Sequence, residues 1–323
     1  MKPNYSNQPQ FKPAWWLRNS HLQTIWPVIC RRRHQLSLEN ERVELPDGDF
    51  VDLNWMGKHE KGPLVFILHG FEGSIESHYA KNMMYALQNA GWRSVFMHFR
   101  GCSGEPNRLA RSYHSGDTKD AEFVVNLLRD REPETPISAI GYSLGGNVLL
   151  KWLGETGKSN PLCAAVAISV PFDLTKAAER IQHGFSRLYQ WYFLKCLRER
   201  LTHKFQFVPT PIDPFNMAIN DIRKFDDRYT APIHGFSGVE EYYSVSSSRQ
   251  YLRGIQKPTL ILHAKDDPFM SEDVIPSSQE LSSSIKLEVT ETGGHVGFVA
   301  GKFPWRPQYW LEQRIPLFLR EYF

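Results

Sequence analysis

A serine between closely spaced glycines is the residue best placed to do chemistry in this chain. Gly141-Tyr142-Ser143-Leu144-Gly145 has the pattern Gly-x-Ser-x-Gly. An apolar run at residues 137–140 precedes it, and a helix-forming run at residues 147–153 follows it. A serine on a tight turn between a strand and a helix is held with its hydroxyl exposed, as in a nucleophile elbow. The N–H groups of the helix point at the same spot. We therefore predict that Ser143 is a nucleophile.

A serine hydroxyl needs a base within hydrogen-bonding distance, and the base needs an orienting carboxylate. In proteins whose nucleophilic serine lies on such an elbow, the three residues follow one another in the chain in the order serine, acid, histidine. His295 stands in Thr292-Gly293-Gly294-His295-Val296-Gly297, directly after an expected strand at residues 286–290. The glycines allow an unusual loop path toward Ser143. His295 is therefore the predicted base.

The acid is expected after the strand at residues 259–262. Asp266 and Asp267 both stand there. We favour Asp267, because the following Pro268 restricts its backbone. Asp266 and Asp173, which follows the preceding strand, stay open as alternatives.

A developing oxyanion needs preorganised donors. The sequence offers two backbone N–H groups for this role. Leu144 is the first residue of the helix after Ser143, and Phe71 lies in the loop His69-Gly70-Phe71-Glu72-Gly73 after the first long strand. We predict that these two N–H groups form an oxyanion hole.

Strands and helices alternate from residue 62 onward, which is typical of an α/β fold with a mostly parallel, twisted sheet flanked by helices. The continuous apolar runs predict strands buried on both faces. Strands are expected at residues 42–45, 50–55, 64–68, 94–97, 137–140, 164–168, 259–262 and 286–290, and helices at residues 79–90, 117–130 and 308–322. Pro46-Asp47-Gly48-Asp49 predicts a hairpin between the first two strands, and Asp117 is expected to cap its helix.

Alternation stops between residues 174 and 253, where the composition is helical and rich in aromatic residues. We expect one domain over residues 1–323 with a helical cap inserted at 174–253. Residues 1–40 form an N-terminal segment with Trp15, Trp16 and Trp26 among polar residues. This segment is expected to wrap the core. The alternative is an arm that touches a membrane surface or covers a substrate entrance.

Composition and residue spacing argue against several other classes of protein. The formal charge is +3, from 38 basic and 35 acidic residues, which is too balanced to indicate nucleic-acid binding. The four cysteines have no C-x-x-C spacing and the histidines are dispersed, so we expect no metal and no disulfide framework. No signal peptide or spanning apolar run is found, and a cytoplasmic protein is expected. The sequence carries no signal of an oligomeric state.

These motifs together resemble the α/β-hydrolase superfamily. The resemblance extends from about residue 15 to the C-terminus and includes several longer strings. They are Asn19-Ser20-His21-Leu22-Gln23-Thr24, Glu44-Leu45-Pro46-Asp47-Gly48-Asp49-Phe50, and the strings at residues 97–107, 261–269 and 293–298. The resemblance implies a charge-relay set of Ser143, Asp267 and His295. It does not fix a substrate.

The function we expect is hydrolysis of a small-molecule carboxylic ester through an acyl-enzyme, with no cofactor. Aromatic residues of the cap, such as Trp191 and Phe193, suggest an apolar acyl group, although they could equally pack the cap onto the core. Two alternatives stay open. One is an acyltransferase or thioesterase on the same triad, and the other is a non-catalytic binding protein that keeps the fold. Arg100 is expected in an ion pair, and His98 and His114 are expected to be structural.

Overall fold

An eight-stranded sheet organises the chain in the computed structural model, which describes residues 10–210 and 219–323. Its strands, in spatial order, are β1 (Glu39–Glu44), β2 (Phe50–Met56), β4 (Arg93–Met97), β3 (Leu64–Leu68), β5 (Ile137–Tyr142), β6 (Ala164–Ile168), β7 (Thr259–Ala264) and β8 (Ile285–Thr290). The β1–β2 hairpin and the β2–β4 pair are antiparallel, whereas β4 to β8 are parallel. The expected α/β fold and its hairpin are confirmed.

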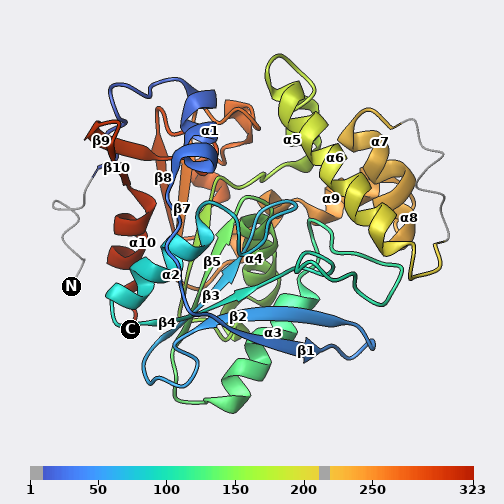
Figure 1. Cartoon of the computed structure of the whole chain (residues 1–323), viewed down its shortest axis with the longest axis horizontal. Helices are drawn as coiled ribbons and strands as arrows, with labels where there is room; N and C mark the ends of the chain where they lie inside the picture. Colours follow the sequence, from blue (N-terminus) through green and yellow to red (C-terminus); the bar gives the residue numbers. More distant parts are fainter. Residues whose placement is uncertain (1–9, 211–218) are drawn as a thin grey trace.

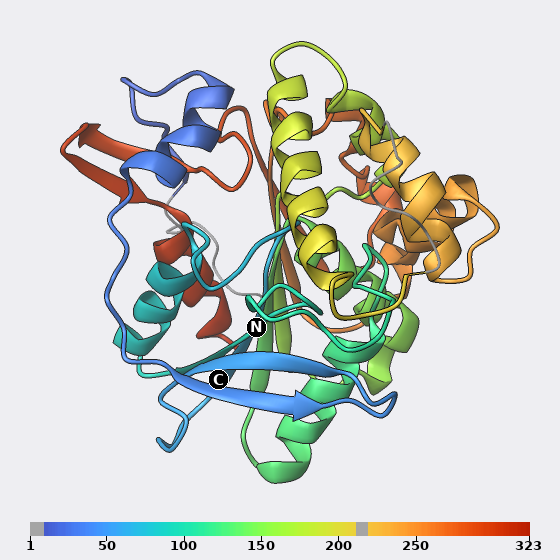
Figure 2. The ribbon, with the colours of Figure 1, turned by 45° about the vertical axis from the view of Figure 1, so that its right-hand side comes forward.

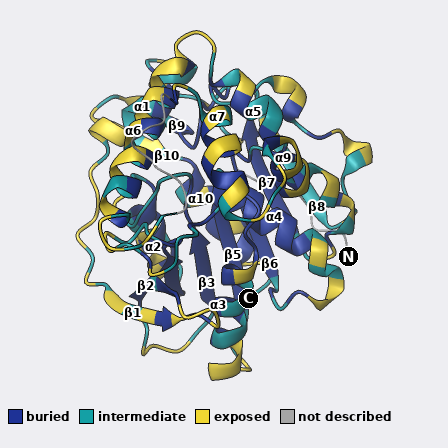
Figure 3. Ribbon diagram, turned by 90° about the vertical axis from the view of Figure 1, so that its right-hand side faces the viewer, coloured by how far each residue is buried: buried dark blue, intermediate teal, exposed yellow. Residues whose placement is uncertain are grey.

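Helices cover both faces of the sheet (Figure 1). They are α2 (Ala80–Asn89) and α10 (Leu311–Leu319) on one face and α3 (Lys119–Arg131) and α4 (Leu144–Thr156) on the other. Successive side chains of a strand point to opposite faces. Accordingly Leu64, Phe66 and Leu68 of β3 join the core under α3 and α4, and Val65 and Ile67 join the core under α2 and α10. Figure 3 shows the central strands buried and the outer sides of the helices exposed.

Between β6 and β7 the chain forms a separate group of helices. They are α5 (Leu174–Arg180), α6 (Ser186–Lys204), α7 (Ile222–Phe225), α8 (Ala231–Ile233) and α9 (Val239–Ser246). The group lies at the upper right of Figure 1, and Figure 2 shows α6 along its full length. Most of the segment expected as a cap, residues 174–253, is therefore helical. Residues 211–218 of that segment lie outside the described residues.

Three elements of the structure were not expected from the sequence. Helix α1 (Ser20–Cys30) lies within the N-terminal segment, and β9 (Val299–Phe303) pairs with β10 (Arg306–Tyr309) in a second, two-stranded sheet. The last helix therefore begins at Leu311 and not near residue 308. The Ala14 N–H donates to the Val299 carbonyl at 3.0 Å, so the N-terminal segment packs beside this hairpin. Residues 1–9 of the segment lie outside the described residues.

The prediction that Asp117 caps the N-terminus of α3 was wrong. Helix α3 begins at Lys119 with Thr118 at its N-cap position, and no side chain caps it. The carboxylate of Asp117 instead accepts a hydrogen bond from Arg111 at 2.6 Å. An ion pair with a residue six positions earlier has thus taken the side chain that the helix-capping pattern assigned to α3. Among the described residues no helix combines the length and the apolar character needed to cross a bilayer.

Candidate active site

Ser143 occupies the turn between β5 and α4. Its backbone is in the left-handed region, with φ 50° and ψ −117°, which costs a residue other than glycine about 1–3 kcal/mol. The Ser143 N–H donates to the Ile168 carbonyl at 2.8 Å and fixes the turn to β6. A Cβ on Gly145 would lie 2.4 Å from the His69 carbonyl oxygen, so only glycine allows α4 to start this close to the end of β3. The turn holds the hydroxyl at the N-terminus of α4.

His295 joins Ser143 to a carboxylate. Its Nε2 lies 2.9 Å from Ser143 Oγ, and its Nδ1 lies 2.8 Å from Asp267 Oδ2. Because an ionised carboxylate can only accept, Nδ1 carries the proton and donates it to Asp267. The lone pair of Nε2 therefore faces the serine hydroxyl. The structure brings together three residues that are separated by 152 and 28 positions in the sequence.

Asp267 is the acid that contacts the histidine. It is buried, and its second oxygen accepts a hydrogen bond from the Phe269 N–H at 2.9 Å. The ring of Phe269 stacks on His295 with centroids 4.0 Å apart. Asp266 accepts from the Gly294 N–H, and Asp173 caps α5 through the Lys176 N–H. Both alternative acids thus have structural partners of their own.

The two predicted oxyanion donors lie next to the elbow. The Gly70 N–H donates to Tyr79 Oη at 2.8 Å, and the Glu72 N–H donates to Tyr113 Oη at 2.9 Å. Between them, the Phe71 N–H has no acceptor among the described residues, and the same holds for the Leu144 N–H at the start of α4. A Cβ on Gly70 would lie 3.2 Å from Ser143 Cβ, so the loop passes directly beside the serine.

Sequence reasoning missed several side chains that hold these loops. His69 donates from Nδ1 to the Gly70 carbonyl at 2.7 Å, because its Nε2 accepts from the Phe99 N–H at 3.0 Å. Burial lowers the pKa of His69 to about 3, so the ring is neutral at physiological pH. In the sequence, only the position of His69 next to Gly70 indicated that this side chain holds the loop after β3.

The loop that carries His295 is held by two hydroxyl groups. Thr24 Oγ1, on α1, accepts from the His295 N–H at 2.9 Å. Ser169 Oγ accepts from the Val296 N–H at 3.0 Å. No spacing in the sequence points to either contact, because each joins segments more than 100 residues apart.

A cavity of about 760 Å³ opens onto Ser143 and His295. Its walls come from α1, from the loop after β3, and from α5 and α6. The apolar residues from α1, α5 and α6 that line it are Ile25, Val28, Ile29, Leu174, Ala177, Ala178, Ile181, Leu188, Tyr189, Trp191, Tyr192 and Phe193. Polar side chains such as Asp226 and His78 line other parts of the wall. The cavity is therefore large and apolar for much of its extent.

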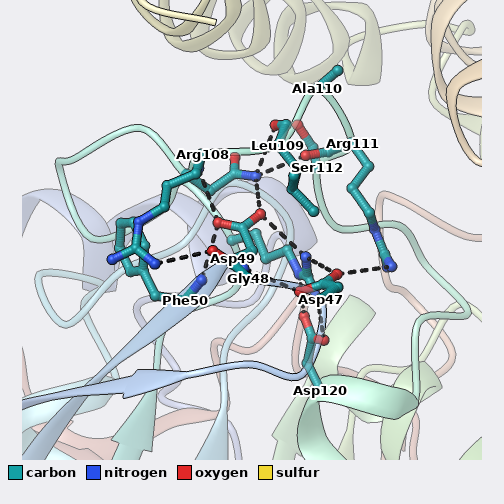
Figure 4. A network of polar contacts seen from close by, with 12 residues as sticks. Asp47, Gly48, Asp49, Phe50, Arg108, Leu109, Ala110, Arg111, Ser112 and Asp120 are labelled. Carbon is teal, nitrogen blue, oxygen red and sulfur yellow. Dashed lines mark hydrogen bonds and ion pairs between the residues drawn. The ribbon is translucent and has the colours of Figure 1, made fainter.

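Figure 4 shows a separate polar network around Asp47, Asp49 and Asp120, and these carboxylates accept hydrogen bonds from Arg100. Its guanidinium group donates to both oxygens of Asp120, at 2.6 and 2.7 Å, and to Asp47 at 2.7 Å and Asp49 at 3.1 Å. The expected ion pair is confirmed, and it ties the β1–β2 turn to α3. The expectation for His98 also holds, since its Nε2 lies 2.6 Å from Asn54 Oδ1 and its Nδ1 lies 3.1 Å from the Cys102 carbonyl.

The chain is similar to several known proteins. It is 44% identical over 98% of its length to "Putative esterase YheT" of Escherichia coli, of which it covers 95%. It is 29% identical over 91% of its length to "Phospholipase ABHD3" of Mus musculus, of which it covers 74%. An esterase of Pyrococcus furiosus has the same fold, with a TM-score of 0.59, 20% identity and coverage of 88% of this chain and 91% of the esterase.

The family model described as the alpha/beta hydrolase fold matches residues 63–302, which include the elbow, the loop after β3 and the loops that carry Asp267 and His295. The resemblance noted in the sequence is thereby confirmed. This chain is a member of the α/β-hydrolase family.

Proposed function

We propose that this protein is a serine hydrolase that cleaves carboxylic esters through an acyl-enzyme. The observation that carries the proposal is the continuous hydrogen-bonded path from Asp267 through His295 to Ser143, which ends in an apolar cavity. Relatives named esterase and phospholipase support the same class of reaction.

In the acylation step, Ser143 Oγ attacks the ester carbonyl carbon while His295 Nε2 takes the hydroxyl proton. Asp267 holds the Nδ1 tautomer and stabilises the imidazolium that forms. The tetrahedral oxygen then receives hydrogen bonds from the N–H groups of Phe71 and Leu144, which lack other acceptors in the described chain. When the intermediate collapses, His295 passes its proton to the leaving alcohol.

Deacylation repeats these steps with water. His295 removes a proton from a water molecule, which attacks the acyl carbonyl, and Ser143 leaves with the returned proton. Every step uses only these side chains, the two backbone N–H groups and water, so the reaction proposed here requires no cofactor.

The cavity favours an apolar acyl group. The walls from α5 and α6 present Leu174, Ile181 and Phe193, and Phe193 also packs on Phe71 with ring centroids 5.2 Å apart. Burying an acyl chain here gains roughly 0.8 kcal/mol per methylene group. We propose that residues 174–253 act as a cap that sets the acyl length.

The test is turnover of p-nitrophenyl esters over a series of acyl lengths by the native chain and by Ser143→Ala. We expect turnover to rise with acyl length over the first members of the series and to be abolished in the variant. A fluorophosphonate probe should label the native chain at Ser143 and leave Ser143→Ala unlabelled. Full turnover in Ser143→Ala, or no labelling of the native protein, contradicts the proposal.

The products distinguish hydrolysis from acyl transfer. With a competing alcohol or thiol present, a hydrolase releases mainly the free acid. Preferential formation of a new ester or thioester would move the assignment to an acyltransferase on the same residues.

A further inference from the structure

Large apolar side chains are exposed beside the mouth of the cavity. On α6, Leu188, Trp191 and Tyr192 follow one another at helical spacing and are 51–61% exposed. On α1, Leu22, Val28 and Ile29 are 51%, 54% and 75% exposed. The two helices are neighbours, because His21 on α1 packs against Phe185 and Tyr189. An apolar face of this kind on a soluble domain marks an interaction site.

The same face continues to the β9–β10 hairpin. Trp15 is exposed, and its Nε1–H donates to the Lys302 carbonyl at 2.9 Å. Trp305, in the turn between β9 and β10, is 76% exposed and stacks on Phe303. Figures 1 and 2 both show α1, the hairpin and the upper part of α6 on one side of the molecule. Tryptophan is enriched where an apolar phase meets water, as at a bilayer surface.

Basic residues are concentrated on these segments, although the whole chain carries a formal charge of only +3. Residues 10–38 and 299–310 contain no aspartate or glutamate. Arg18, Arg32, Lys302 and Arg306 are exposed there, and none of the four forms an ion pair with another described residue. The face is therefore apolar and positively charged at the same time.

We propose that this face docks on an anionic phospholipid surface, and we name it the docking surface: Leu22, Val28 and Ile29 of α1, Leu188, Trp191 and Tyr192 of α6, and Trp15 and Trp305. The apolar side chains enter the boundary between headgroups and acyl chains, and the flanking arginine and lysine side chains contact lipid phosphates. A second copy of the chain fits less well, because pairing this face with itself would bring like charges together.

Docking places the cavity mouth against the lipid. An acyl chain would then pass from the bilayer to Ser143 along the cavity, whose lining includes Ile29 and Leu188, without crossing water. Entry of an acyl chain from the bilayer rests on the proposed esterase function, but the docking of the protein on lipid does not.

The test is co-sedimentation of the full chain with phosphatidylcholine vesicles, with and without phosphatidylglycerol. We expect binding to the anionic vesicles, weaker binding at high salt, and little binding to phosphatidylcholine alone. Arg18→Glu/Lys302→Glu should weaken binding to anionic vesicles by about tenfold or more, since each basic residue near the surface contributes to attraction.

A second variant tests the apolar part of the surface. Leu22→Ser/Trp305→Ser should also lower vesicle binding, and because neither residue lines the cavity, it should keep native turnover of a water-soluble short-chain ester. The matched control is Phe207→Ser, which removes an equally exposed aromatic residue beyond the other end of α6 and should bind as the native chain does.

Ser143→Ala should bind vesicles like the native protein, so loss of the esterase function would not affect this test. Equal binding to neutral and anionic vesicles overturns the proposal, and so does native binding by the Leu22→Ser/Trp305→Ser variant. If the native chain is dimeric in light scattering and that variant is monomeric, the face belongs to a second copy and the lipid assignment is wrong.

Discussion

Arg200 on α6 donates hydrogen bonds from Nε to both carboxylate oxygens of Glu72, at 3.2 and 3.0 Å. Glu72 follows Phe71 directly and has a φ of 50°. Its carboxylate also accepts from Tyr113 Oη at 2.7 Å, and both members of the ion pair are largely buried. Although burial acts to lower the pKa of Arg200, the Glu72 carboxylate raises it above its ordinary value. A helix inserted between β6 and β7 therefore fixes the loop that carries a proposed oxyanion donor.

Arg200→Met should lower both stability and turnover. Removing one partner leaves a buried carboxylate without its cation, which costs about 3 kcal/mol in unfolding free energy. The substitution should shift the loop that carries Phe71 without removing the Phe71 N–H. We therefore expect kcat to fall by about tenfold, which is less than the ~100-fold or larger loss that follows when an oxyanion donor is removed. Urea unfolding and turnover of a short-chain ester measure the two effects.

The double variant Arg200→Met/Glu72→Gln separates these effects. It removes the unpaired charge, so much of the lost stability should return while kcat stays low. Native kcat in the single variant would show that the loop holds its geometry without α6.

Thr24→Val tests the support of the histidine loop. Valine has nearly the shape of threonine but offers no acceptor to the His295 N–H, which leaves a buried donor unsatisfied at a cost of about 1–3 kcal/mol. We expect a lower kcat with little change in KM, because the base is displaced and the cavity is not. Thr24→Ser is the control and should keep most of the activity. Equal kcat in the valine and serine variants would argue against this positioning role.

Alanine substitutions at Gly70 and at Gly145 should differ in their effects on stability and on kcat. At Gly70 the new Cβ would lie 3.2 Å from Ser143 Cβ, a contact that small shifts relieve, so the protein should fold and kcat should fall. At Gly145 the Cβ would lie 2.4 Å from the His69 carbonyl oxygen, which is backbone. Overpacking there should cost about 3 kcal/mol or more. Thermal unfolding and turnover of both variants give the comparison, and a Gly145→Ala variant with native stability would contradict it.

The raised pKa of Asp226 should make the stability of the protein depend on pH. Burial raises its pKa to about 6, although hydrogen bonds from Thr230 and Tyr243 oppose the shift. The unfolded value is about 3.9, so between about pH 4 and 6 the folded state binds more protons than the unfolded state. The contribution of Asp226 to stability is therefore present below about pH 4 and is lost as pH rises through 6.

The measurement is the unfolding free energy of the native chain and of Asp226→Asn, by urea denaturation from pH 4 to pH 7. Relative to the variant, the native chain should lose about 1–3 kcal/mol over this window. A difference between the two that does not vary with pH would place the pKa of Asp226 outside it.

The central sheet and the candidate site were largely predictable from the sequence. Leu64–Leu68 and Ala164–Ile168 are apolar at every position because helices cover both faces of these strands. Parallel strands bring their carboxyl ends to one edge of the sheet, so chain order alone was enough to propose that Ser143, Asp267 and His295 meet there. The structure places them within hydrogen-bonding distance.

The supports of the site were not predictable in the same way. Thr24 with His295 and Arg200 with Glu72 join segments 271 and 128 residues apart, and no local pattern encodes either contact. Helix α1 did have a local signal, because the Asn19 side chain accepts from the N–H groups of His21 and Leu22 as an N-cap. At Asp117 the local pattern was misleading, because Arg111 competes for the same carboxylate.

The bond between Thr24 and His295 also bears on how the protein is made. Helix α1 leaves the ribosome before the loop on which it docks, which is translated 271 residues later, roughly 14–54 s at ~5–20 residues per second. During that interval the Thr24 hydroxyl has no contact with the loop that carries His295, so one native support of the loop cannot yet form. We expect this contact of α1 to form only after the chain has been translated past His295.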